Sequence, residues 1–337
     1  MKLYEHQGKA LFKQAKIPIP KGALITKPKQ LQGILKAQVL EGGRGKAGLI
    51  KKTTKEKSKK HIAKLLKKCK TILAEEILPI KQEHYLSAMV DRDACTIKII
   101  YSPKGGIDIE EVAKKTPDEV KYYTNPDNVP KRFKPMAIKL FDLLKKKDLL
   151  LAEINPLIET TNGKLIAADA KVIVDDNALS RQPEFLKEYS SRLSKEEKQA
   201  NKHDIHFVKL KGNIAVIGNG AGLVMTTLDL LSQKKLKPAD FLDVKGGANE
   251  KSMRGALELV HKAKPKALFI NIFGGITHCD AIAKAIAKWK LKNKTKIPIV
   301  VRMIGTNEKE AEQILSKANI TPVHSLEKGI QTLRRAL

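Results

Sequence analysis

The feature that most constrains the fold is a change of pattern near residue 208, after which short apolar segments alternate with amphipathic helical segments. The apolar segments are 213–217, 241–244, 267–273, 298–303 and a weaker one at 320–323. Such alternation predicts a doubly wound parallel sheet, an α/β fold that binds ligands at the carboxyl ends of its strands. A polar, charged stretch at 190–206 precedes the change, so we expect two domains, residues 1–200 and 206–337.

Glycine-rich turns follow three of these predicted strands, at residues 218–222, 246–247 and 274–275. Each turn stands where a strand leads into a helix, so helix N-termini with free N–H groups converge on one edge of the sheet. One glycine-rich turn can reflect tight packing alone. Three at equivalent positions predict an anion site, most simply for phosphate.

The first half of the chain has a different, α+β pattern. We expect a helix at 5–16, a lysine-rich helix after residue 50, a helix at 135–147, strands at 71–78, 85–91 and 96–101, and a hairpin of 149–159 with 164–174. A strand at 34–40 runs into residues 41–48, which contain four glycines and two cations, Arg44 and Lys46. Glycines let backbone N–H groups approach an anion closely, so this loop is a second candidate phosphate site.

Net charge raises the alternative of a nucleic-acid-binding protein. The chain has 65 Lys and Arg against 36 Asp and Glu, so 65 − 36 = +29, and residues 51–70 contain ten lysines. Aromatic residues make up only 4% of the chain, whereas nucleic-acid sites combine clustered cations with stacking side chains. We interpret the charge mainly as lysines on solvated faces and expect no specific nucleic-acid partner, with a basic nucleic-acid-binding protein kept as the alternative.

One segment runs against the basic background. Residues 150–180 contain five acids and two lysines, a net charge of −3. An acidic segment of this kind is where a divalent cation could be held.

The remaining composition bears on location. Apolar runs such as 267–276 are shorter than the ~20 residues needed to span a bilayer, so we expect no membrane association. The N-terminal residues lack the apolar core of a secretory signal, and the three cysteines form no CxxC pair. We therefore expect a cytoplasmic protein with reduced cysteines.

Five motifs together resemble the β subunit of succinyl-CoA synthetase (succinate–CoA ligase) in their order and spacing. They are 5–12 (EHQGKALF), 42–48 (GGRGKAG), 153–157 (EINPL), 219–223 (NGAGL) and 271–276 (NIFGGI). The resemblance covers nearly the whole chain. It implies an N-terminal ATP-grasp domain followed by a C-terminal flavodoxin-like domain, which agrees with the two patterns above.

The resemblance also implies a set of residues that bind ATP or ADP. These are Lys36, Gly43, Arg44, Gly45, Glu75, Leu78 and Glu83. Lys36 is similar to the family lysine that reaches the phosphates, and the glycine loop resembles the one that closes over them. The backbone near Leu78 would border the base, and Glu83 could hold the ribose hydroxyls. For Glu83 the alternative is a surface glutamate on a strand edge.

Three further residues resemble the family's metal and catalytic groups. Asn155 and Asp169 are similar to the ligands of one Mg²⁺ per subunit, and they fall on the two arms of the predicted hairpin. ATP phosphates and water would complete the octahedron. Glu153 lies on the same face as Asn155 by strand alternation and resembles the glutamate that meets the phosphorylated histidine.

The second half resembles the part of the family that serves the acid substrate. Asn219, Gly275, Ile276 and Thr277 are similar to its succinate and phosphate site. None of the eight histidines lies in the phosphohistidine motif, which in the family belongs to an α subunit that also binds CoA. The resemblance therefore implies an αβ or α₂β₂ enzyme that passes a phosphoryl group among ATP, succinate and the partner's histidine, as in the tricarboxylic acid cycle.

Some positions depart from the family pattern. Residues 26–35 are shorter than the usual lid, Lys245 stands where a third glycine is usual, and Thr277 with His278 replaces a commoner valine–arginine pair, so a contact there could depend on pH. Pro20 resembles the ATP-using form more than the GTP-using form. A GTP-using enzyme and a related ligase for malate, acetate or citrate remain alternatives.

Overall fold

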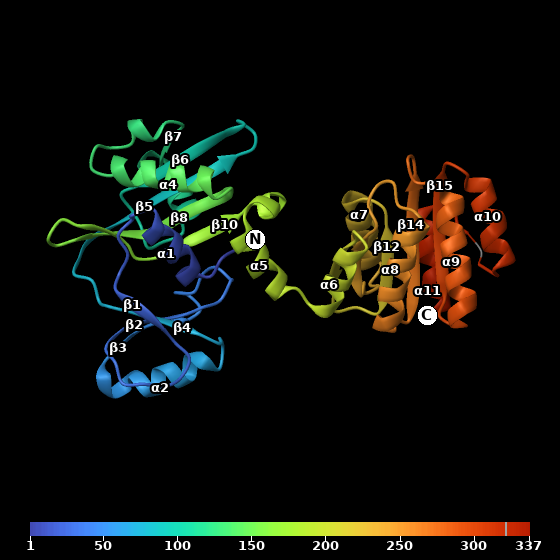
Figure 1. Ribbon diagram of the computed structural model, residues 1–337, viewed down its shortest axis with the longest axis horizontal. Coiled ribbons are helices and arrows are strands. Elements are labelled where there is room, and N and C mark those ends of the chain that lie inside the picture. The colour runs from blue at the N-terminus through green and yellow to red at the C-terminus, as the bar shows by residue number, and fades with distance from the viewer. Residues whose placement is uncertain (321) are drawn as a thin grey trace. The chain divides into compact units, whose positions relative to one another are not determined.

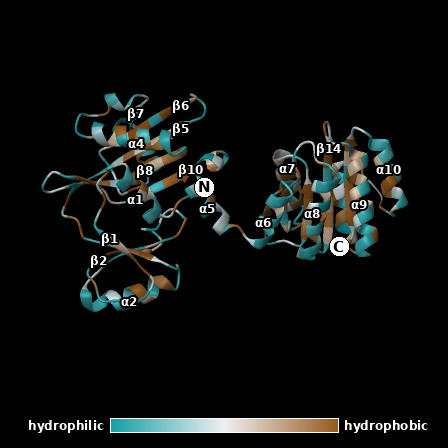
Figure 2. Ribbon diagram, in the orientation of Figure 1, coloured by the Kyte–Doolittle hydropathy of each residue, from teal (hydrophilic) through white to brown (hydrophobic). Residues whose placement is uncertain are grey.

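The computed structural model describes residues 1–320 and 322–337, and its chain forms two compact units, residues 1–189 and 190–337 (Figure 1). Figure 2 shows that the hydrophobic residues concentrate in the strands and on the helix faces turned toward them. None of the helices in the described part of the chain is long and apolar enough to cross a membrane.

The first unit contains two antiparallel sheets. The smaller sheet has the strand order β1-β4-β2-β3, and the larger has the order β10-β8-β5-β6-β7 with β9 paired to β8. Its strands are β1 (Gly22–Ile25), β2 (Gly33–Ala37), β3 (Ile50–Thr53), β4 (Ile72–Glu75), β5 (Ile80–Asp91), β6 (Thr96–Ser102), β7 (Lys121–Tyr123), β8 (Leu149–Thr160), β9 (Leu165–Ala167) and β10 (Lys171–Val174). Its helices are α1 (Glu5–Gln14), α2 (Lys55–Leu66), α3 (Ile109–Lys115) and α4 (Lys134–Lys146), with α5 (Pro183–Arg192) at the boundary and short 3₁₀ turns η1 (Pro117–Glu119), η2 (Pro126–Asn128) and η3 (Asp176–Arg181).

Helix α1 is held close to strand β10. The side-chain oxygen of Gln7 accepts a hydrogen bond from the Tyr4 N–H (3.0 Å), which caps the first turn. Gly8 faces β10, where a Cβ atom would lie 3.1 Å from both Ala170 Cβ and Val172 Cγ2. A larger residue at position 8 would have to displace one of these neighbours. Glycine therefore allows the first turns of α1 to lie directly beside residues 168–170.

The predicted hairpin forms, but its second arm is not one strand. Strands β8 and β9 pair around a turn in which the Gly163 N–H donates to the Thr160 carbonyl (2.8 Å). The prediction of a continuous strand over 164–174 is wrong, since residues 168–170 separate β9 from β10. The Ala168 carbonyl there accepts hydrogen bonds from two lysine ammonium groups instead of a neighbouring strand, and the Asp169 carboxylate accepts from the Ala170 N–H (2.7 Å).

The second unit has one five-stranded sheet with the order β11-β13-β12-β14-β15. Four of its strands are parallel in the order of a flavodoxin-like fold, which confirms the predicted α/β architecture. Its strands are β11 (His206–Lys209), β12 (Ile214–Gly218), β13 (Asp240–Asp243), β14 (Ala267–Gly274) and β15 (Ile299–Gly305). Its helices are α6 (Lys195–Lys202), α7 (Ala221–Gln233), α8 (Glu250–Ala263), α9 (Cys279–Asn293), α10 (Glu308–Lys317) and α11 (Leu326–Ala336).

Three points of this unit bear on the sequence interpretation. Strand β11 pairs antiparallel with β13 at the sheet edge and was not predicted. The predicted strand at 320–323 includes residue 321, which lies outside the described residues, and Pro322 makes a single parallel bridge to Val301. Helix α6 packs against β11 and α8 and buries Ala200 in this unit's core, whereas the sequence-based division places residues up to 200 in the first domain.

Both faces of the parallel sheet are covered. Ile217 and Ile270 belong to a core with α8 and α9, while the neighbouring residues Val216 and Phe269 belong to a core with α7 and α11. Side chains alternate between faces along a strand, so both faces being apolar requires helices on both sides. The carboxyl ends of β12 and β14 lie at the point where the strand order reverses, which is the usual ligand site of such sheets.

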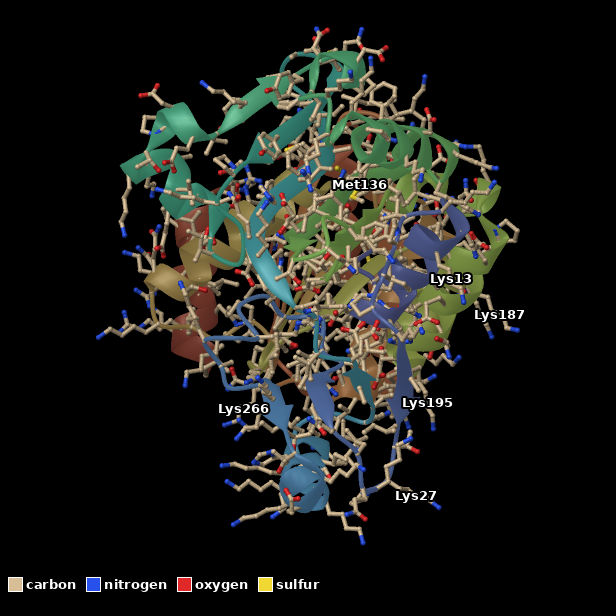
Figure 3. The ribbon with its side chains drawn as sticks, turned by 90° about the vertical axis from the view of Figure 1, so that its left-hand side faces the viewer. Lys13, Lys27, Met136, Lys187, Lys195 and Lys266 are labelled. Carbon is tan, nitrogen blue, oxygen red and sulfur yellow. The ribbon has the colours of Figure 1, made fainter. Side chains whose placement is uncertain are left out.

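Lysines occupy the solvated faces of many elements. Figure 3 shows side chains such as Lys13, Lys27 and Lys187 extending away from the ribbon, and all three are exposed. The lysine-rich helix α2 buries Ile62 and Leu65 against the smaller sheet. Helix α2 is therefore amphipathic, and its lysines follow from its exposed face without requiring a polyanion partner.

Candidate active site

A cavity of about 760 Å³ in the first unit is lined by residues from both sheets. This volume is within the range of about 300–1,000 Å³ typical of small-molecule sites. All ten candidate residues of the first half of the sequence line it: Lys36, Gly43, Arg44, Gly45, Glu75, Leu78, Glu83, Glu153, Asn155 and Asp169. Segments far apart in the sequence thus converge on one cavity.

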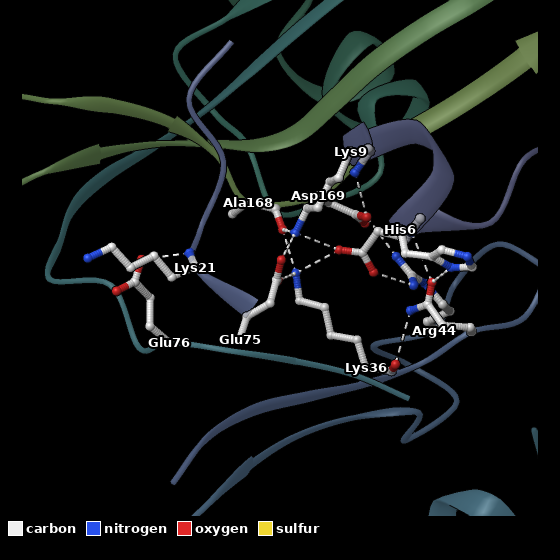
Figure 4. A network of polar contacts seen from close by, with 12 residues as sticks. His6, Lys9, Lys21, Lys36, Arg44, Glu75, Glu76, Ala168 and Asp169 are labelled. Atoms are coloured by element: carbon white, nitrogen blue, oxygen red, sulfur yellow. Dashed lines mark hydrogen bonds and ion pairs between the residues drawn. The ribbon is translucent and has the colours of Figure 1, made fainter. Parts of the chain in front are cut away.

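A buried cluster of charges forms one wall of the cavity (Figure 4). The Lys36 ammonium lies 2.9 Å from Glu5 Oε1 and 2.8 Å from Glu75 Oε2, and it also donates to the Ala168 carbonyl. Lys9 reaches the same three groups from α1: its ammonium lies 2.9 Å from Glu5 Oε1, donates to the Ala168 carbonyl at 2.7 Å, and pairs with Glu75. Two ammonium groups therefore share two carboxylates and one carbonyl.

Burial and neighbouring charges together set the ionisation of this cluster. Burial alone would raise the pKa of Glu5, but Lys36, Lys9 and Arg44 hold that pKa well below its ordinary value. Burial also opposes the charge of Lys36, whose pKa is nevertheless raised by Glu5, Glu75 and Asp169. For Lys9, burial prevails over the attraction of Glu5 and lowers the pKa.

Arg44 connects the glycine loop to this cluster. Its guanidinium nitrogens lie 2.5 Å from Glu5 Oε2 and 2.6 Å from Asp169 Oδ1. Gly43 and Gly48 adopt φ values of +70° and +66°, in the left-handed region that favours glycine, and no atom lies within 4 Å of where their Cβ atoms would be. These two glycines are therefore needed for the path of the loop, which carries Arg44 and exposes backbone N–H groups beside the cavity.

A second loop, at residues 105–108, contributes Gly106, Ile107 and Asp108 to the cavity lining. The Gly106 N–H donates to Asn155 Oδ1 (2.7 Å), and Asn155 Nδ2 donates to the Ile107 carbonyl (2.8 Å). Gly106 has a φ of +74°, and a Cβ there would lie 2.2 Å from Glu83 Oε2. Burial raises the pKa of Glu83. The sequence analysis missed this loop, although the Gly105–Gly106 pair after a strand was a usable signal.

The donors present are of the kind that hold Mg²⁺. Asp169 offers a carboxylate of which one oxygen is engaged by Arg44 and Ala170, and Asn155 offers an amide oxygen that accepts one hydrogen bond from Gly106. Burial raises the pKa of Glu153, Lys171 opposes that rise, and the charge of Asp169 adds to it. A carboxylate and an amide oxygen fit Mg²⁺, with phosphate oxygens and water as further ligands.

The closest grouping of three possible metal ligands lies elsewhere. Among the described residues, only Glu308, Glu312 and His324 place three carboxylate or imidazole ligand atoms within 4.8 Å of one another. His324 is exposed, and its Nδ1 lies 3.7 Å and 3.5 Å from the two carboxylates, as expected for polar contacts at a surface. The sequence analysis did not predict this group.

In the second unit, the four candidate substrate residues meet at the ends of β12 and β14. Asn219 Oδ1 accepts from the Phe273 N–H (2.8 Å), and Asn219 Nδ2 donates to the Phe273 carbonyl (2.9 Å) and to Thr277 Oγ1 (3.2 Å). Thr277 is buried, whereas Gly275 is exposed and Ile276 is 84% exposed. The side chains of Asn219 and Thr277 therefore fix the turn, and the residues presented outward are Gly275 and Ile276.

The two unusual residues near this edge have defined places. Lys245 adopts a φ of +66°, where glycine is favoured, and its ammonium pairs with Asp204. His278 is the residue before α9, and its Nδ1 lies 3.3 Å from Asn307 Nδ2. Lys245 thus occupies the turn with a backbone strain of about 1 kcal/mol.

Comparisons with known proteins place the chain in a family. The ATP-grasp domain model matches residues 2–129 and the CoA-ligase model matches residues 217–333. The β subunit of ADP-forming succinate–CoA ligase from Methanocaldococcus jannaschii is 39% identical, with 98% of each chain covered. The corresponding proteins of Staphylothermus marinus and Ehrlichia canis are 36% and 33% identical, with at least 93% of each chain covered.

The chain belongs to the succinate–CoA ligase β-subunit family. It is therefore a ligase, and the predicted order of an ATP-grasp domain followed by a CoA-ligase domain is confirmed. A structure of ATP citrate lyase from Methanothrix soehngenii in complex with citrate and coenzyme A is also similar, with a TM-score of 0.77, 15% identity and 99% of each chain covered. At that identity the likeness concerns the fold.

Proposed function

We propose that this chain is the ATP-binding β subunit of a succinate–CoA ligase that forms succinyl-CoA, ADP and phosphate from succinate, CoA and ATP. The observation that carries the proposal is the single cavity lined by all ten candidate residues, in a chain that matches β subunits of that enzyme over almost its whole length. A partner α subunit would supply the CoA site and the histidine that carries the phosphoryl group.

The residues that line the cavity of the first unit would bind and orient the nucleotide. Lys36, Arg44 and the backbone of the glycine loop offset the phosphate charge, Leu78 borders the base, and Glu83 accepts hydrogen bonds from the ribose. Asn155 and Asp169 would hold Mg²⁺, which neutralises charge that develops on the transferring phosphoryl group. Arg44 would then exchange its contact with Asp169 for one with phosphate, a change that the glycines on either side allow.

Glu153 has the properties of a residue that receives the partner's histidine. It lines the cavity and is 12% exposed, and burial and Asp169 raise its pKa while Lys171 opposes the rise. A carboxylate in such a position stabilises an imidazolium and orients its ring, which favours phosphoryl transfer between nucleotide and histidine. We propose this role for Glu153.

The edge formed by β12 and β14 would serve the acid and the partner subunit. Helices α7 and α9 begin there, so their N-terminal N–H groups are available to a carboxylate or phosphate. Gly275 and Ile276 are exposed, and Phe273 beside them is 59% exposed. An exposed apolar group next to an anion site suits contact with a second protein subunit.

Co-expression with a candidate α subunit tests the proposal. The purified complex should release ADP and phosphate from ATP only when succinate and CoA are both present, and γ-³²P from ATP should label the α subunit on a histidine. Malate, acetate, citrate and GTP are assayed in parallel, since a related ligase or a GTP-using form would turn over with one of these instead. A complex that forms but turns over none of these acids would refute the proposal.

A further inference from the structure

Lys9 is a buried charge for which the proposed reaction has no direct use. Its side chain is 3% exposed. Among the described residues, Glu5, Glu75 and Ala168 line the cavity, whereas their partner Lys9 does not. It therefore lies behind the cavity wall. A lysine buried so completely at the cost of its hydration needs a compensating role.

The contacts of Lys9 duplicate those of Lys36. Both ammonium groups bond Glu5 Oε1, the carboxylate of Glu75 and the Ala168 carbonyl, and Figure 4 shows them on either side of these acceptors. Lys36 lines the cavity and Lys9 does not. The two lysines and two glutamates have no net charge together.

We propose that Lys9 is a positioning residue for the nucleotide phosphates, because it supplies the second positive charge on the Glu5 and Glu75 carboxylates that hold Lys36. Without Lys9, two carboxylates would share the Lys36 ammonium. Their excess negative charge would cancel the attraction of Lys36 for phosphate and would also repel the phosphates directly. The inference rests on the proposed binding of nucleotide in this cavity.

A charge series on the full-length chain tests the inference. Lys9→Met makes the four-residue group −1, Glu75→Gln makes it +1, and the double variant returns it to zero. With Mg²⁺ present, the Kd for ADP should rise about tenfold in Lys9→Met, the size expected for one unit charge removed nearby at an effective dielectric constant of about 20. It should fall about tenfold in Glu75→Gln, because the group then carries one more positive charge, and the double variant should lie close to wild type.

Lys13→Met is the matched control, since Lys13 lies one turn further along α1, carries the same charge and is exposed. Its Kd for ADP should equal that of wild type. Adenosine, which has no phosphates, separates positioning from a structural role, because its affinity should not change in any variant. A structural defect would weaken adenosine and ADP alike.

The outcomes separate the proposed function of the chain from the proposed role of Lys9. Wild-type protein that binds no ADP would refute the proposed function itself. Wild-type binding together with unchanged affinity in Lys9→Met would refute only the role of Lys9. If Lys9→Met does not fold, the comparison of Glu75→Gln with the double variant decides. Loss of Lys9 from the Glu75→Gln variant should still weaken ADP binding about tenfold. Equal ADP affinities in these two variants would overturn the inference.

Discussion

Asp240 provides the sharpest test of the energetics of the second unit. It is 1% exposed at the start of β13, and its Oδ1 accepts a hydrogen bond from the Val216 N–H (2.9 Å). Its Oδ2 has no hydrogen-bond partner among the described residues. Burial raises the pKa of Asp240 to about 7, and the hydrogen bond from Val216 opposes that rise.

The sign of the pH dependence follows from this shift. Between the ordinary pKa of 3.8 and about 7, the folded protein holds a proton on Asp240 that the unfolded chain releases. The free energy of unfolding should therefore fall as the pH rises through this window and be independent of this group above it. The difference between the two pKa values corresponds to about 4 kcal/mol.

Asp240→Asn removes the titration while keeping an acceptor for Val216. Its amide hydrogens would be left without partners, at a cost of about 1–3 kcal/mol. The variant should therefore be more stable than wild type by about 1–3 kcal/mol at pH 8 and less stable below about pH 5.

Urea unfolding monitored by tryptophan fluorescence reports on the second unit, which contains Asp240. Trp289 is the chain's one tryptophan, and it is buried in α9 within the second unit. The exposed Asp229 on α7 gives the control, because Asp229→Asn should leave the pH profile unchanged. Parallel profiles for wild type and Asp240→Asn from pH 4 to 8 would refute the reasoning.

Two further substitutions test the two candidate sites. Gly106→Ala would place a methyl group 2.2 Å from Glu83 Oε2 at a φ of +74°, so we expect a lower unfolding midpoint and weaker ADP binding. Gly222→Ala, with open space around its Cβ on helix α7, should lower neither the unfolding midpoint nor the ADP affinity. Equal ADP affinity in the two variants would contradict the placement of the 105–108 loop. Ile276→Asp should weaken assembly with the α subunit without changing stability or ADP affinity, while Leu291→Asp, at an exposed position near the C-terminal end of α9, should assemble normally. Co-purification with the α subunit distinguishes them.

The parallel sheet could be predicted from sequence because its strands are buried on both faces and are therefore largely apolar. Strand β12 is buried at every position and contrasts with the polar segments around it. Strand β11 has one buried residue, Phe207, and gives neither an apolar run nor an alternation. An edge strand of this kind is defined by its hydrogen bonds to the neighbouring strand, here β13, and this pairing cannot be read from the sequence.

The charge cluster could not be predicted for a different reason. Glu5 and Lys9 are four residues apart on a helix, a spacing typical of ion pairs on solvated helix surfaces. Here the pair is buried, because Gly8 lets α1 approach β10 so closely. Likewise, the break at residues 168–170 depends on the lysines that bind the Ala168 carbonyl, and those lysines come from distant parts of the chain.

The measurement that bears most directly on the central claim is Mn²⁺ binding in the presence of ADP, followed by electron paramagnetic resonance. The account predicts one ADP-dependent Mn²⁺ ion per chain, abolished by Asp169→Asn and unchanged by Glu312→Gln, which alters the other grouping of possible ligands. Mn²⁺ binding that survives Asp169→Asn, or that is lost in Glu312→Gln, would contradict the assignment of the metal and nucleotide to the cavity of the first unit.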